Sequence, residues 1–67
     1  MIEPIDIWRL AQLLIEEHGQ DASGLAMQHA VDSHARSDAE DEADWLRIFD
    51  AIRELQRATR GPQEQAH

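Results

Sequence analysis

The sequence predicts an all-α fold, specifically a three-helix up-down-up bundle with short connections. Apolar residues recur every three or four positions in three segments of the 67-residue chain, and no segment alternates apolar and polar residues as a strand does. Residues with a β-branched side chain, which strands prefer, are sparse. The breaks at Gly19-Gln20 and Ser37 are short, and short connections join helices that run roughly antiparallel. We therefore expect residues 1–67 to form one helical domain.

The first helix is expected over about residues 5–18. Pro4 suits the first turn, where its missing amide proton is not needed, and Gly19 lies where a left-handed residue ends many helices. One stripe of the helical wheel holds apolar residues and a terminal histidine: Ile7, Trp8, Ala11, Leu14, Ile15 and His18. Leu10 and Leu13 lie outside this stripe.

The second helix is expected over about residues 22–36, with Asp21 as a candidate N-cap. Ala22, Ala26 and Ala30 recur at every fourth position, and Ser23, Met27, Val31 and His34 lie beside them. Small residues at this spacing allow another helix to approach closely. Gly24 weakens the helix by about 1 kcal/mol relative to alanine, so we expect this helix to form only against its neighbours.

The third helix is expected over about residues 38–59. Ser37 and Glu40 fit a capping box, in which each side chain accepts from the other residue's amide. The apolar stripe consists of Trp45, Ile48, Phe49, Ile52 and Leu55. Arginines follow in the last turns, where they complement the helix dipole, and Gly61-Pro62 predicts the end of the helix. The polar tail, residues 61–67, is expected to be flexible.

The formal net charge is −8, from 14 acidic and 6 basic residues. Such a surface repels nucleic-acid phosphate and anionic lipid, so we expect no direct nucleic-acid or membrane binding. The chain has no cysteine and is short, so its core is small and neither disulfides nor thiolate metal sites can support it. Close helix packing and self-association are the remaining sources of stability, and we expect a homodimer. With no apolar run long enough to span a membrane and no basic leader, we expect a cytoplasmic protein.

The sequence gives no support for catalysis, so we expect neither an enzyme nor a bound cofactor. The serines have no nucleophile elbow, and no glycine-rich phosphate loop is present. His18, His29 and His34 lie within a short, carboxylate-rich span, but on the wheel His29 and His34 point more than a third of a turn apart. A zinc site needs three or four converging ligands. We expect no metal, with His18 capping a helix end, His34 packed or half-buried and His29 solvated.

An acidic run opens the third helix and consists of Asp38, Glu40, Asp41, Glu42 and Asp44. These carboxylates complement the positive end of the helix dipole, which makes a solvated helix start the simpler interpretation. A dipole of about half a charge needs fewer than five of them, however. The alternative is a partner surface on which the run mimics nucleic acid and inhibits a basic protein.

Two groups of large apolar residues bear on association. Trp8 and Trp45 lie on apolar stripes, which favours a role as core anchors. Leu10, Leu13 and Leu46 lie off the stripes, and three exposed leucines on a small domain can form a self-association patch. The leading hypothesis is a non-catalytic protein-interaction or scaffold module that self-associates.

One pattern of packing residues also resembles a known group. His18-Gly19, Asp21-Ala22, Ala26, Ala30 and Trp45-x-x-Ile48-x-x-Ala51-Ile52-x-x-Leu55 are similar to short all-helical proteins of alphaproteobacteria, a domain of unknown function. The resemblance covers about residues 7–56. It implies a three-helix fold in a bacterial, cytoplasmic protein, and no activity, cofactor or catalytic residue. The group often has a Gly-Asp step before the third helix, where this chain has Ser37-Asp38.

Overall fold

The computed structural model describes the backbone of residues 3–64 and the side chains of residues 3–58. Helix α1 spans Pro4–His18, the short 3-10 helix η1 spans Gly19–Asp21, α2 spans Ala22–Ala35 and α3 spans Ala39–Glu64. No strand occurs among the described residues. The all-helical prediction is therefore confirmed.

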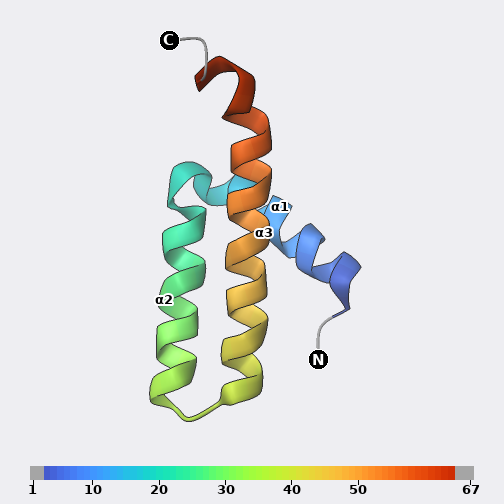
Figure 1. Ribbon diagram of the computed structural model, residues 1–67. Coiled ribbons are helices and arrows are strands. Elements are labelled where there is room, and N and C mark those ends of the chain that lie inside the picture. The colour runs from blue at the N-terminus through green and yellow to red at the C-terminus, as the bar shows by residue number, and fades with distance from the viewer. Residues whose placement is uncertain (1–2, 65–67) are drawn as a thin grey trace.

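Helices α2 and α3 lie side by side and run antiparallel, and α1 crosses behind α3 at an oblique angle (Figure 1). Helix α3 packs against both other helices, whereas α1 and α2 meet mainly near η1, which joins them. The Nε2 of Gln56 donates to the carbonyl of Gly19 at 3.2 Å and so ties η1 to α3. The up-down-up bundle is not confirmed, because α1 does not run alongside the α2–α3 hairpin along its length.

The ends of α1 largely follow the sequence signals. Pro4 occupies the first turn, and the carbonyl of Glu3 accepts from the amides of Asp6 and Ile7 at 2.9 and 3.1 Å. Gly19 has a φ of +60°, the sign that favours glycine. Asp21 precedes α2 as predicted, but its side chain makes no capping hydrogen bond. The 3-10 turn of η1 leads directly into α2, with the amide of Ala22 donating to the carbonyl of Gly19.

The turn between α2 and α3 corrects the predicted capping box. Ser37 has a φ of +62° and belongs to the end of α2. Its amide donates to the carbonyl of His34 at 3.0 Å, and the Asp38 amide donates to the carbonyl of Ser33 at 2.9 Å. These two bonds form a Schellman motif, the arrangement in which a left-handed residue closes a helix. The N-cap of α3 is Asp38 instead, whose Oδ1 accepts from the Asp41 amide at 3.2 Å.

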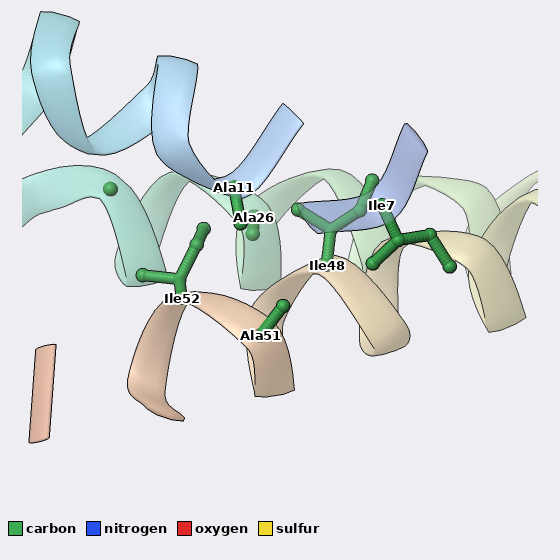
Figure 2. Close-up of a cluster of buried hydrophobic side chains, with 7 residues drawn as sticks. Ile7, Ala11, Ala26, Ile48, Ala51 and Ile52 are labelled. Carbon is green, nitrogen blue, oxygen red and sulfur yellow. The ribbon is translucent and has the colours of Figure 1, made fainter. Parts of the chain in front are cut away.

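Small residues dominate the core where the three helices meet (Figure 2). Among the described side chains, the buried apolar ones are Ile7, Ala11, Ala22, Ala26, Ala30, Ile48, Ala51 and Ile52. Five of these eight are alanines, and the three predicted on α2 are all at most 2 % exposed. Leu14, Ile15, Trp45, Phe49 and Leu55 are partly buried against this cluster. Alanine lets the helix axes approach closely but contributes little apolar area.

The C-terminal part of α3 extends further than the sequence predicted. The helix passes through Gly61-Pro62 and reaches Glu64, although Pro62 has no amide proton to donate to the carbonyl of Ala58. The predicted flexible tail, residues 61–67, is thus helical in backbone as far as Glu64, and residues 65–67 lie outside the described part of the chain.

Candidate functional site

Trp8 is the largest side chain that α1 leaves on the surface. It is 43 % exposed, so the prediction of a core anchor is wrong for this residue. Ile7 and Ala11 are the residues of α1 that become buried, and Trp8 lies about 100° around the helix from Ile7. Helix α1 crosses α3 obliquely (Figure 1), and only Ile7 and Ala11 of α1 are buried, so Trp8 lies beside a narrow buried stripe.

A groove of about 850 Å³ lies between the start of α1 and the middle of α3, next to Trp8. Its lining comes from two elements: Glu3, Pro4, Ile7 and Trp8 precede or belong to α1, and Arg47, Asp50, Ala51, Arg53, Glu54 and Arg57 belong to α3. Ile7 and Ala51 are at most 7 % exposed and therefore form the bottom of the groove. The charged side chains form its rim, with Trp8 as the large exposed apolar group among them.

The charges of this groove differ from those of the whole chain. Among the described residues, three arginines and three carboxylates line it, so this lining carries no net charge, whereas the chain as a whole has a net charge of −8. Arg57 forms an ion pair with Glu54, and the Nη1 of Arg47 lies 3.9 Å from Oδ1 of Asp44. The Arg53 guanidinium lies over the Phe49 ring, 5.6 Å from its centroid. The groove is a charge-balanced surface on an acidic protein.

The acidic run lies at the start of α3, where most of its carboxylates contact groups within the fold. Asp38 caps the helix, and Oε1 of Glu42 lies 3.2 Å from Nδ1 of His34. Asp44 lies near Arg47, as described above. Asp41 accepts from the Ser33 hydroxyl and lies 3.4 Å from Nη2 of Arg36.

These contacts join the end of α2 to the start of α3, with buried Ser33 at their centre. The Ser33 side chain is also 2.9 Å from the carbonyl of His29, and Arg36 reaches back to Asp32 at 3.3 Å. Asp41 and Glu42 thus contact α2, whereas Asp38 and Asp44 contact groups within α3, so four of the five carboxylates already have a contact inside the fold. The nucleic-acid mimic stays a prediction. The test is to replace these carboxylates by amides and to measure binding to a basic protein at several salt concentrations. The mimic predicts a salt-sensitive complex that the replacement abolishes.

The histidines do not converge. His29 is exposed but not simply solvated, because its ring stacks on Trp45 with centroids 4.2 Å apart and planes 12° apart. His34 is not packed or half-buried: its side chain is 77 % exposed beside Glu42. His18 lies at the end of α1 with Nε2 4.0 Å from Oε1 of Glu17. Within residues 3–58, no group of three or more histidine, aspartate and glutamate side chains is arranged to hold a metal ion.

The three leucines of the predicted association patch are exposed, at 36 % for Leu10, 48 % for Leu13 and 39 % for Leu46. They do not share one side of the fold. Leu10 and Leu13 lie about 160° and 140° around α1 from Trp8. Leu46 lies on α3 one turn before Asp50, so it borders the groove.

Sequence reasoning missed the groove because no motif spans it. One signal was available: Asp50, Arg53 and Arg57 recur at three- and four-residue spacing, which places them along one side of α3. Trp8 lies next to these residues because α1 crosses α3 obliquely. A helical wheel describes a single helix, so it cannot show the angle at which two helices cross.

Comparison of the chain with protein-family models, with curated proteins and with solved structures found no match in any of the three. Across the part of the chain that the structure describes, no helix combines the length and the apolar character that a membrane span requires.

Proposed function

We propose that this protein is a small, non-catalytic interaction or scaffold module that self-associates as a homodimer. One observation carries the proposal: the buried core consists mainly of alanine, while large apolar side chains lie on the surface. Among the described side chains, six large apolar ones are at least 36 % exposed, namely Ile5, Trp8, Leu10, Leu13, Val31 and Leu46. Four of the six belong to α1, which makes this helix the main candidate for the interface.

A chain of this size can build only a small hydrophobic core. A domain of about 60 residues buries only about 60 % of the surface that its unfolded chain exposes, and its core rarely supplies more than about 3–5 kcal/mol. Fully burying one large apolar side chain contributes about 1.5–3 kcal/mol. The four large apolar side chains on the surface of α1 are 36–61 % exposed, so covering the exposed part of two or three of them contributes roughly a few kcal/mol per copy, against which the cost of association counts.

In this proposal the three helices form one bundle within a single domain. The resemblance to the alphaproteobacterial group implies a fold of this kind. It places the protein in the bacterial cytoplasm. It assigns no reaction, since the candidate site contains arginine, carboxylate and indole groups without a nucleophile and its base.

Sedimentation velocity over a range from about 1 to 200 μM tests the proposal. We expect the weight-average mass to rise from that of a 7.7 kDa monomer toward twice that value. A mass that stays at 7.7 kDa over the whole range would refute self-association.

A further inference from the structure

We infer that the dimer forms through the Trp8 groove, with the groove of one copy facing the same groove of a second copy across a twofold axis. The inference rests on the proposed self-association and assigns its surface and geometry. It selects one of two candidate surfaces on α1, because Leu10 and Leu13 lie on the side of that helix away from Trp8.

Charge is the first argument for this surface. In a twofold interface the same patch is present on both copies, so each positive group must find its negative partner within that patch. The groove meets this condition, because Arg47, Arg53 and Arg57 line it with three carboxylates. Two copies that each carry a net charge of −8 repel one another, and a neutral patch reduces that repulsion where they touch.

The second argument is the identity of the side chains. Tryptophan and arginine are the residues that most often dominate the energy of a protein interface, especially where an aromatic group fills a pocket. Trp8 is 43 % exposed, and the buried Ile7 and Ala51 form the apolar bottom of the groove next to it. The groove volume of about 850 Å³ lies near the upper end of the range of small-molecule sites, about 300–1,000 Å³. An indole of a second copy fits such a space.

The surroundings of the groove provide the remaining interface. Ile5 is 61 % exposed and lies one turn before Trp8 on the same side of α1. Leu46 borders the groove on α3. A standard interface covers about 800 Å² on each partner, which is about one sixth of the 5022 Å² surface of this chain. Ile5 and Leu46 thus supply two further exposed apolar side chains beside the groove, on α1 and α3 respectively.

Two alanine variants test the assignment in sedimentation velocity. Trp8→Ala removes the proposed anchor, and Leu13→Ala removes a similarly exposed side chain on the opposite side of α1. We expect Trp8→Ala to raise the dimer dissociation constant by about 30-fold or more, the effect of an interface hot spot, and Leu13→Ala to change it by less than about threefold. Far-UV circular dichroism checks that both variants remain helical.

Fluorescence provides a readout that keeps Trp8 in place. In a Trp45→Phe background, Trp8 is the sole tryptophan, and we expect its emission maximum to shift to shorter wavelength as the concentration rises through the dissociation constant. If Trp8→Ala leaves the dimer intact and Leu13→Ala weakens it, the groove assignment is wrong but self-association stands. An emission maximum that stays constant while the mass doubles would also overturn it. A wild-type chain that stays monomeric overturns both proposals.

Discussion

Ser37 occupies a backbone conformation that glycine adopts at lower cost, so replacing it should stabilise the protein. Its φ is +62°, and its amide and that of Asp38 close the Schellman motif at the end of α2. Only the backbone of residue 37 takes part in these two hydrogen bonds. We therefore expect Ser37→Gly to keep the turn and to remove the steric cost of a Cβ atom in the left-handed region.

The expected size follows from two opposing terms. A left-handed L-residue costs about 1–2 kcal/mol, and glycine returns about 0.5–1 kcal/mol of that through its larger unfolded-state entropy. The net gain is about 0.5–1 kcal/mol. For a domain of this size, 1 kcal/mol shifts the melting temperature by about 4–8 °C, so Ser37→Gly should raise it by about 2–8 °C.

Thermal unfolding followed by circular dichroism at 222 nm measures this shift. All variants are compared at one protein concentration, because self-association makes the melting temperature depend on concentration. Ser37→Ala is the matched control, since it removes the hydroxyl and keeps the Cβ atom. If Ser37 were the N-cap of α3, alanine would cost about 1 kcal/mol and glycine a few tenths. A Ser37→Gly variant that melts below the wild type would refute the assignment of Ser37 to the end of α2.

Substitutions at three further positions test the corner and the core. Asp38→Ala removes the N-cap of α3 and should lower the free energy of unfolding, measured in urea, by about 1 kcal/mol. Asp38→Asn keeps a capping oxygen and should lower it by only about a few tenths of a kcal/mol. Equal losses for the two variants would contradict the cap. Ser33→Ala keeps the volume but removes the buried hydroxyl that donates to Asp41, so we expect a loss of about 1 kcal/mol, and no loss would show that the hydroxyl is not needed. Ile52 is 0 % exposed, so Ile52→Ala should lower the free energy of unfolding by about 2–5 kcal/mol and Ile52→Val by about 0.5–1.5 kcal/mol. Circular dichroism at 25 °C should then show Ile52→Ala largely unfolded and Ile52→Val folded.

The helices and their inner faces were predictable because these features are local. The spacing of Ala22, Ala26 and Ala30 placed the small-residue face of α2 correctly, and all three are buried. Gly19 also has the positive φ that its position suggested. Each of these predictions depends on residues within a few positions of one another, where helical geometry leaves little freedom.

The errors occurred where two elements meet. The sequence at Ser37-Asp38 fits a cap at either residue, and the end of α2 decides between them by taking Ser37 into its Schellman motif. Trp8 was assigned to the core because its helix is amphipathic, but the depth of burial depends on how α1 crosses α3. The stack of His29 on Trp45 likewise needs the register of the α2–α3 hairpin, which no local pattern contains.

The distribution of charge along α3 links the fold to the proposed dimer. Carboxylates at its start offset the helix dipole and join α2 to α3 through Ser33, His34 and Arg36. The arginines follow in later turns, where α1 crosses and Trp8 is exposed. One surface is thereby neutral while the whole chain remains acidic. Under the proposed geometry this asymmetry limits association to two copies, because once the neutral grooves face one another, the surfaces left outside are acidic and repel a third copy.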